Sequence, residues 1–485
     1  MTDPRLVPDA LASAAPVQEI QPARRRWWLF CACLLLAAYA LMMIVPSFQA
    51  PDEFDHVRRA FQLSDGDFLL RSVDGLPSGG HEDPALETYM VGFSALPHHP
   101  EVRMDDASRI ALESLHWGQQ PRVFQAVPST ANYFPAVYLP QAAGMAAGRA
   151  MNLSVGQTYR LARWCALLAA IALLMVACRV HAPPPLAAGI FALPMSLFLL
   201  SSAAPDGVLM AIAMLGLSAF ARLAVERDAA PRHLAALLLI CIFLLVTSSP
   251  GLLPMFVFPL AVALGSRFRW QRTAMATVVM LLAMAWIGFM LRTTVYSPGA
   301  DQPGDLPRLT FFLMHPWTFL HGLRETVLAG GHVQFYAMSF LGVFGWLDTF
   351  LPAYAYRALL LLLIVLAGCS FVAPANRASL IARWLLLGCA ALSTLLTFLA
   401  PPGHWLQPGT DVAANIQGRY FLVPALMVTY ALSLGGAFVR PIRLRFALLF
   451  LVLLLVVSTS ATTYSLVSRF HLAPESSHGL PDGRP

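Results

Sequence analysis

The chain has 485 residues, of which 58% are hydrophobic and only 12% are charged, and its formal net charge is +6. Soluble domains carry about twice that share of charged residues, so the composition excludes an ordinary soluble protein. All 32 basic residues are arginines. In so apolar a chain they indicate loops anchored at a membrane face rather than nucleic-acid binding. The seven cysteines lie in or beside apolar runs, which indicates neither a disulfide framework nor a metal cluster.

A polar stretch of 26 residues comes first, and the segment Arg24–Trp28 at its end combines three arginines with two tryptophans. The apolar run that follows, 28–48, is too long for the apolar region of a signal peptide. Basic and aromatic residues at the start of a membrane helix mark the cytoplasmic interface. We therefore expect a disordered cytoplasmic tail over 1–26, a first helix that leaves the cytoplasm, and a second disordered tail at 468–485.

Apolar runs recur along the chain, and several reach the length of about 17–25 residues that crosses a bilayer as a helix. The loops that alternation places in the cytoplasm carry arginines, whereas the short loops 202–205 and 248–250 on the other face carry none. This asymmetry orients membrane helices. It predicts an all-α polytopic membrane protein with one transmembrane domain, 27–467, of about eleven helices. The predicted spans are 28–48, 161–178, 184–202, 206–225, 234–248, 251–266, 273–293, 354–373, 384–400, 420–438 and 446–466.

Two further segments contain apolar residues but are predicted not to cross the membrane. Segment 133–151 is broken by two prolines, and segment 332–352 is rich in glycine and aromatic residues, which disfavours one regular helix. Counting 133–151 as a span would also move the later arginine-rich loops to the other face. The large exterior loops are then 49–160, with interfacial or re-entrant helices, and 294–353. The first part of loop one, 49–132, holds thirteen of the 26 acidic residues.

A dense cluster of charge at 52–59 (DEFDHVRR) directly follows the first apolar run. In a helix, Asp52, His56 and Arg59 share one face, while Asp55 reaches Arg58 and Arg59 at i+3 and i+4. A carboxylate in apolar surroundings can act as a general base, and the planar fork of arginine fits phosphate oxygens. The alternative is a solvated helix cap whose charges form local salt bridges.

Two more charged residues are expected on the same outer face. Asp206 follows a proline at the start of the run 206–225, and the alternative to a functional role is an N-cap, a position that Asp favours. Arg419 is the only arginine of the exterior loop 401–419 and stands between Gln417-Gly418 and Tyr420. A phosphate partner would explain an arginine there, and the alternative is a side chain that extends to the membrane interface.

Asp348 lies in an otherwise apolar stretch. Such an acid is costly and is usually paired or functional, but the sequence does not identify its partner. His81, His98 and His99 lack the spacing of metal ligands, and the chain contains no P-loop, dinucleotide-binding turn or nucleophile elbow. The nature of any bound metal stays open.

The acidic motif after the first span, the large exterior loop and the Pro-Asp pair after the third span resemble integral-membrane glycosyltransferases of the GT-C fold. Six segments between about 28 and 465 also look like a bacterial family of polytopic membrane proteins of unknown function. In chain order, these segments are PDEFDHVRRAFQLSDGD, NYFPAVYLPQ, SSAAPDG, FFLMHPWTF, GVFGWLDTFLP and NIQGRYFLVP. The resemblance implies a GT-C-like bundle with a large first periplasmic loop.

The same resemblance implies roles for individual residues. It makes Asp52 or Glu53 the catalytic base, and Asp206 a second acid that supports the acceptor, a metal or the base. It also makes 133–141 an element that contacts a lipid carrier. Many relatives have a basic residue at the turn after the fifth span, where this chain reads TSSPG. Because of this departure, the binding of the donor phosphate is expected from Arg419, Arg58 or Arg59 instead.

The resulting hypothesis is a glycosyltransferase of the bacterial inner membrane, with a cytoplasmic N-terminus and a periplasmic active face. It would move a sugar from a polyprenyl-phosphate donor in the lipid bilayer to a glycan, lipid or protein acceptor of the cell envelope. Whether Asp52, Glu53 and Asp206 bind a divalent cation, Mg²⁺ or Mn²⁺, stays open. A transporter or flippase, which predicts ionisable residues deep within spans, and a non-catalytic assembly factor are the alternatives. The candidates for binding substrate are His56, Arg58, Arg59, Tyr133, Tyr138, Asp348, Gln417, Arg419 and Tyr420.

Overall fold

The computed structural model describes residues 20–295, 310–311, 314–328, 331–398, 416–435 and 441–472. The described part of the chain is mostly helical, as an all-α membrane protein requires. Most of each predicted tail and most of the exterior loop 401–419 lie outside these residues. The first helix already begins at Ile20, inside the stretch expected to be a tail.

Seven helices are long and apolar enough to cross a membrane within the described ranges. The most enclosed of them is α10, which packs against α7, α11 and α19. Its apolar window is 83% buried inside the protein, so α10 forms the centre of the bundle. The seven are α1 (Ile20–Ile44), α7 (Val155–Val180), α10 (Asp206–Glu226), α13 (Arg269–Thr293), α17 (Ala353–Ser370), α18 (Arg377–Thr397) and α20 (Pro441–Phe470).

The other four predicted spans are helical but short or broken. The run 184–202 is divided before Pro194, because proline cannot continue the hydrogen-bond ladder of the preceding helix. The run 251–266 begins as a 3-10 helix with Pro254 inside it. A bundle of eleven spans therefore stays a prediction. The elements are α8 (Pro185–Phe191) with α9 (Pro194–Leu200), α11 (His233–Ser248), η3 (Pro250–Phe256) with α12 (Val257–Leu264), and η5 (Gly418–Phe421) with α19 (Leu422–Ser433).

The two segments predicted not to cross contain only short elements. Segment 133–151 folds into η1 (Pro135–Tyr138) and α6 (Leu139–Ala150), and α6 packs against α7 and α2. Segment 332–352 folds into α16 (His332–Gly342) and a hairpin of β3 (Val343–Phe344) and β4 (Thr349–Phe350). None of these helices reaches the length of about 17 residues that a span needs.

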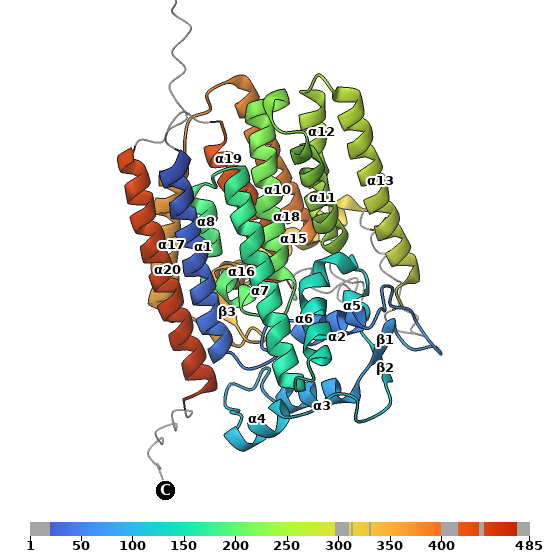
Figure 1. Ribbon diagram of the computed structural model, residues 1–485. Coiled ribbons are helices and arrows are strands. Elements are labelled where there is room, and N and C mark those ends of the chain that lie inside the picture. The colour runs from blue at the N-terminus through green and yellow to red at the C-terminus, as the bar shows by residue number, and fades with distance from the viewer. Residues whose placement is uncertain are drawn as a thin grey trace, which may run out of the picture.

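The segment 49–132, which the sequence predicts as the first part of exterior loop one, builds a compact layer, the exterior-loop layer, at one end of the bundle, at the bottom of Figure 1. Strand β1 pairs antiparallel with β2, with Gly79 opposite Ala126. A separate apolar core joins this layer to α7 through Phe48, Tyr89 and Tyr159. The elements are α2 (Glu53–Ser64), β1 (Gly79–Glu82), α3 (Pro84–Phe93), α4 (Asp106–Glu113), β2 (Val123–Ala126) and α5 (Pro128–Ala131).

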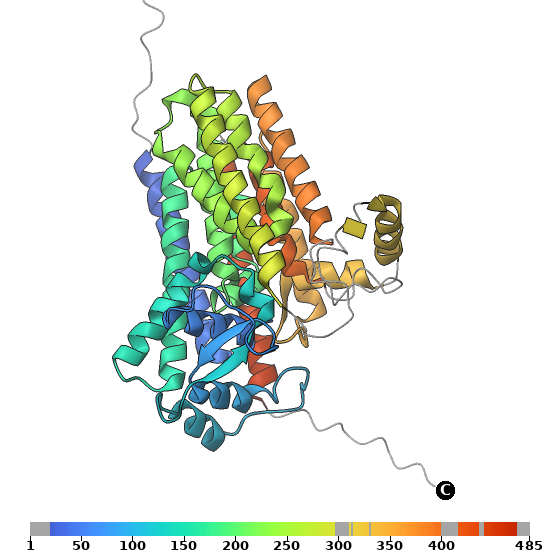
Figure 2. The ribbon, with the colours of Figure 1, turned by 90° about the vertical axis from the view of Figure 1, so that its right-hand side faces the viewer.

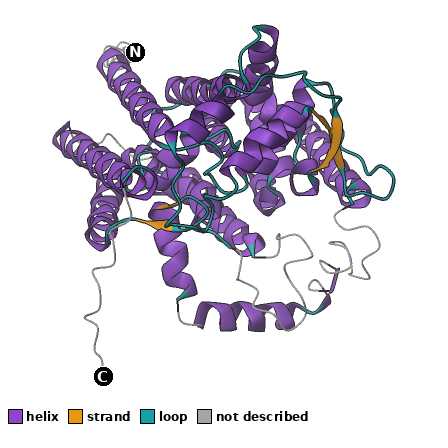
Figure 3. Cartoon of the chain, turned by 90° about the horizontal axis from the view of Figure 1, so that it is seen from below, coloured by secondary structure: helices purple, strands orange, loops and turns teal. Residues whose placement is uncertain are grey.

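The two ends of the bundle differ in charge. The connections from α7 to α8, α10 to α11, α12 to α13 and α17 to α18 lie at the end where α1 begins, opposite the exterior-loop layer (Figure 1). Each of them contains an arginine or has one within two residues of it in the adjoining helix. This is the two-sided arrangement that the arginine pattern predicts. Helix α15 (Pro316–Leu328) contacts α16 and lies beside the bundle, across its axis (Figures 2 and 3).

Candidate functional site

The site begins where α1 gives way to α2. Asp52 is the residue before α2, and its backbone has a left-handed φ of 61°. Asp is among the preferred helix caps, yet its side chain makes no capping hydrogen bond to α2. The carboxylate instead forms an ion pair with Arg419.

Arg419 is fixed and Asp52 is accessible. The Arg419 side chain is 3% exposed and the Asp52 side chain 44% exposed. One guanidinium nitrogen of Arg419, Nη1, donates to the carbonyl of Pro51 at 3.1 Å, and Nη2 donates to Asp52. The ring of Tyr420 lies 5.2 Å from the guanidinium carbon. Nε of Arg419 and Oε1 of the neighbouring Gln417 are buried without a hydrogen-bond partner.

Close packing against α16 holds this part of η5 in position. The backbone N–H of Gly418 donates to Oγ of Ser339 at 2.8 Å. A Cβ at position 418 would lie 2.0 Å from the backbone nitrogen of Phe340, so only glycine fits there. The position of Arg419 is therefore fixed by the close backbone contact of its neighbour Gly418 with α16, which a residue with a side chain at position 418 would prevent.

Asp206 is the first residue of α10 and does not cap it, because Pro205 occupies the N-cap position. The alternative interpretation of Asp206 as an N-cap is therefore wrong. Its side chain is half-buried, and in the described ranges it has no hydrogen bond or ion pair. Its charge acts on His56, Tyr133 and Arg419. The loop before Asp206 also touches the start of α2, because the backbone N–H of Ala203 donates to Glu53 at 2.6 Å. Asp206 therefore lies in the same region as Asp52.

His56 lies on the buried side of α2. Its Nδ1 and the hydroxyl of Tyr138 are 2.8 Å apart, and the ring of Tyr133 is 5.6 Å from the imidazole. Burial lowers the pKa of His56, and the charges of Asp206 and Asp52 oppose that shift without reversing it. The imidazole is therefore neutral at pH 7, so His56 can relay or orient a proton but adds no cation.

Asp52 keeps its negative charge in this setting. Burial raises the pKa of its carboxyl, but the charge of Arg419 and the hydrogen bond from Arg419 outweigh burial, so the pKa is below its usual value. A carboxylate whose pKa is lowered in this way is a weak base as long as the ion pair with Arg419 is intact.

Glu53 is adjacent in sequence but serves another purpose. It is 2% exposed, and its carboxylate accepts hydrogen bonds from the backbone of Ala50 (3.0 Å), the backbone of Ala203 (2.6 Å) and the hydroxyl of Tyr159 (2.8 Å). These contacts fasten the start of α2 to the loop before α10 and to α7. Glu53 therefore positions the loops that carry Asp52 and Asp206.

The predicted contacts of Asp55 with Arg58 and Arg59 are wrong. Arg58 forms ion pairs with Glu82 and Glu87 of the exterior loop, and Asp55 accepts from the hydroxyl of Ser129 at 2.5 Å. Arg59 is buried and donates to the carbonyls of Asp67 (2.9 Å) and Phe68 (2.8 Å). Partners from other segments displace the intrahelical ones because the loop folds around α2.

Asp348 acquires the partner that the sequence does not identify. Its carboxylate lies 3.7 Å from Arg469 near the end of α20 and accepts from the backbone of His98 at 3.0 Å. Arg469 also donates to the carbonyls of Leu96, His99 and Val102. Asp348 therefore joins the hairpin of β3 and β4 to the exterior loop and the last helix.

Two residues of the site were not singled out from the sequence, although the predicted carrier-binding element 133–141 includes one of them. Tyr159 supports Glu53 from α7. Gln141, fully buried on α6, donates to the carbonyl of Ala204 at 3.5 Å, next to Asp206. Gln141 closes the motif NYFPAVYLPQ, which is the one signal that could have indicated it; nothing in the pattern around Tyr159 marks that residue.

The described residues of the site are not arranged as a set of metal ligands. Within the described residues, no group of three or more His, Cys, Asp or Glu side chains is arranged to hold a metal ion. Asp52 is paired with Arg419, and Glu53 is saturated by hydrogen bonds. The acids that the sequence offered to Mg²⁺ or Mn²⁺ are thus already engaged, except Asp206.

The chain was compared with protein-family models, with curated proteins and with solved structures. No curated protein and no solved structure matches it. One family model matches residues 33–429, most of the chain, including Asp52, Asp206 and Arg419. The chain therefore belongs to the family described as predicted membrane protein DUF2142.

Proposed function

We propose that this protein is a membrane glycosyltransferase that transfers a sugar from a polyprenyl-phosphate donor to an envelope acceptor on the outer face of the bacterial inner membrane. The observation that carries the proposal is the contact between Asp52 and Arg419, with Asp206 beside it. An accessible carboxylate next to a buried guanidinium offers the two functions that such a transfer needs: a base for the acceptor and a cation for the departing phosphate.

In the proposed step, Asp52 removes the proton from an acceptor hydroxyl. The acceptor oxygen attacks the anomeric carbon of the sugar, and the bond between that carbon and the phosphate oxygen breaks. The polyprenyl phosphate leaves with the bonding electrons, the proton stays on Asp52, and the anomeric configuration inverts. Arg419 stabilises the charge that develops on the phosphate, so no protein acid is needed for the leaving group.

Other charged residues of the motif receive supporting roles. The carboxylate oxygens of Glu53 are occupied by three donors, so Glu53 is not assigned as the base. Arg58 and Arg59 are occupied by carboxylates and carbonyls, which leaves Arg419 for the donor phosphate. We assign Asp206, whose carboxylate has no partner among the described residues, to the acceptor.

His56 and Tyr138 support the base. Their hydrogen bond lies beside Asp52, and a neutral imidazole exchanges protons without adding charge. Tyr133 and Tyr420 flank the same site. Aromatic rings suit the apolar faces of a sugar or the first isoprene units of a carrier.

The test uses the full chain in proteoliposomes with radiolabelled polyprenyl-phosphate hexoses and pentoses. D52N and D206N should each lose sugar transfer, because the base or the acceptor contact is removed. D106N is the matched control: Asp106 is an exposed acid of the same exterior loop. If both site variants transfer sugar at the wild-type rate, the enzyme proposal fails. Movement of the lipid-linked sugar across the bilayer without transfer would instead identify a transporter.

A further inference from the structure

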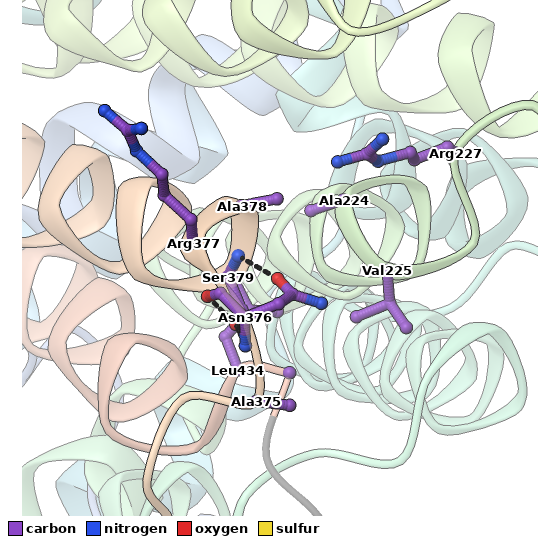
Figure 4. A pocket seen from close by; sticks show the side chains of 10 residues that line it. Ala224, Val225, Arg227, Ala375, Asn376, Arg377, Ala378, Ser379 and Leu434 are labelled. Carbon is purple, nitrogen blue, oxygen red and sulfur yellow. Dashed lines mark hydrogen bonds between the residues drawn. The ribbon is translucent and has the colours of Figure 1, made fainter.

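A cavity of about 590 Å³ opens at the end of the bundle opposite the Asp52–Arg419 site. Three helix ends form it: the end of α10 with η2 (Arg227–Ala229), the start of α18 and the end of α19 (Figure 4). Its size is within the range of about 300–1,000 Å³ of small-molecule sites. The cavity is therefore large enough for a ligand and belongs to none of the features described above.

The lining of the cavity carries uncompensated positive charge. Arg227 and Arg377 stand on opposite sides of it, both exposed (Figure 4). Neither forms an ion pair within the part of the chain that the structure describes. The nearby acids are engaged elsewhere: Glu226 pairs with Arg222, and Asp228 pairs with Arg272 and accepts from Ser266.

Asn376 adds a neutral donor between the two arginines. Its side-chain oxygen accepts the backbone N–H of Ser379 at 2.8 Å and thereby caps α18. The amide nitrogen is left over and points toward α10 (Figure 4). Two guanidinium groups and an amide are donors without acceptors, which is the composition of an anion site.

The backbone of Arg227 is an independent sign of a role for its side chain. It has φ 52° and ψ −120° at the C-terminal end of α10. A non-glycine residue at positive φ is strained, and the combination with a ψ of −120° is one that glycine adopts most readily. An arginine at this position destabilises the fold locally, and its side chain lines the cavity. Backbone strain of this kind is concentrated at functional sites.

The position of the cavity indicates the source of the anion. It lies at the arginine-rich end of the bundle, where Trp270 near the start of α13 and Trp384 in α18 are 77% and 65% exposed. Exposed tryptophans and arginines mark the level of lipid head groups. Basic pockets between helix ends at this level bind anionic lipid heads.

We propose that this cavity binds a phosphate group, held by Arg227, Arg377 and the amide of Asn376, of the kind carried by anionic phospholipids. Each guanidinium can make paired hydrogen bonds to phosphate oxygens. The site is separate from the proposed transfer of sugar and does not depend on it. It gives the protein a specific lipid or phosphate ligand at the face opposite its candidate active site.

The experiment measures ligand binding by the purified full chain in detergent, by native mass spectrometry and by thermal unfolding. The probes are phosphatidylglycerol, phosphatidylcholine and inorganic phosphate. The variant R227G/R377Q removes both cations, and the glycine that it places at the end of α10 also relieves the strained backbone, so this variant should fold. The variant R269Q is the control, because Arg269 is an exposed arginine at the same end that does not line the cavity.

The proposal predicts that phosphatidylglycerol binds about tenfold or more weakly to R227G/R377Q than to wild type, and equally well to R269Q, since two charge-assisted contacts are lost. Phosphatidylcholine should bind weakly to all three. If inorganic phosphate binds with the same arginine dependence and the lipid does not, the ligand is a soluble phosphate and the site stands. If neither probe distinguishes R227G/R377Q from R269Q, the proposal is overturned.

Discussion

Arg419 donates a hydrogen bond to Asp52 across 367 positions of sequence, and this contact joins the first exterior loop to the start of the tenth predicted span. The arginine is anchored by the carbonyl of Pro51, whereas the aspartate is half-exposed and free of any capping bond to α2. Of the two partners, Asp52 is therefore the one that can be displaced. A phosphate that enters the site must compete with this carboxylate for the guanidinium.

The first prediction follows from this competition. D52N should bind undecaprenyl phosphate more tightly than wild type, by about threefold to tenfold, because the variant has lost the carboxylate that competes with the ligand for Arg419. An ion pair whose carboxylate is half-exposed to solvent contributes about 1 kcal/mol. The same variant should lose sugar transfer. Binding is measured by titration of the lipid into the chain reconstituted in nanodiscs.

Two controls separate charge from competition. D206N removes an equal charge from the same site without freeing Arg419, so it should tighten binding less than D52N. R419Q should weaken binding in either background. An affinity that is unchanged in D52N would mean that phosphate does not use the nitrogen paired with Asp52, and an affinity that is unchanged in R419Q would remove Arg419 from the donor site.

The second prediction distinguishes Glu53 from Asp52. E53Q replaces an oxygen that accepts from Ala50 or Ala203 by an NH₂ group, so two donors face each other in a buried place. We expect a loss of about 1–3 kcal/mol of stability with transfer per folded molecule retained. Thermal unfolding and transfer assays of the same preparations measure both quantities.

Y159F is the matched comparison for E53Q. It removes one donor to Glu53 and also the hydroxyl that accepts from the buried backbone N–H of Phe48 at 3.1 Å, so we expect a loss of stability of similar size, about 1–3 kcal/mol. If E53Q unfolds like wild type but no longer transfers sugar, Glu53 rather than Asp52 is the base.

Much of the fold and part of the site can be predicted from the sequence, since both rest on local patterns. All eleven apolar runs are helical over most of their described length, and the motif at 52–59 does begin a helix beside Arg419 and Asp206. Spacing within a helix also predicted partners for Asp55, and there it failed. A pair at i, i+4 is worth only a few tenths of a kcal/mol, so carboxylates that the folded loop brings to Arg58 easily replace it.

The contacts that fix the site geometry could not be predicted, because they join distant segments. Glu53 accepts from residues 106 and 150 positions away, and Asp348 pairs with an arginine in the last helix. No periodicity or motif encodes such distances. The proline breaks of α8 to α9 and η3 to α12 shortened two predicted spans for a local reason, but whether the short helices still cross depends on packing.

The third prediction concerns Asp348, which the sequence offers as a substrate-binding residue. D348N leaves buried Arg469 without its carboxylate and weakens the acceptor for the backbone of His98. Hydrogen exchange in the segment 96–103 should accelerate, while sugar transfer persists. D106N again provides the control in the same loop. If hydrogen exchange is unchanged but sugar transfer is lost, Asp348 is a substrate-binding residue, as the sequence predicts.

The last prediction concerns the pH dependence of the exterior-loop layer. Glu82 on β1 is fully buried, and one of its oxygens, Oε2, has no hydrogen-bond partner. Burial raises the pKa of Glu82 to about 7, against the opposing charge of Arg58. In the unfolded chain the pKa of a glutamate is about 4.3. Between these two values the folded layer holds a proton that the unfolded chain has released.

The free energy of unfolding of this layer should therefore fall as the pH rises from about 4.3 to about 7 and then level off, because the folded state binds more protons in that window. E82Q, neutral at every pH, should remove this part of the slope. E87Q, which alters the half-exposed second partner of Arg58, should keep it. Hydrogen exchange of β1 and β2, measured at pH values from 4 to 8 and corrected for the intrinsic rate, reports the free energy of unfolding of the layer in wild type and in both variants. A slope that persists in E82Q would assign the titration to another group.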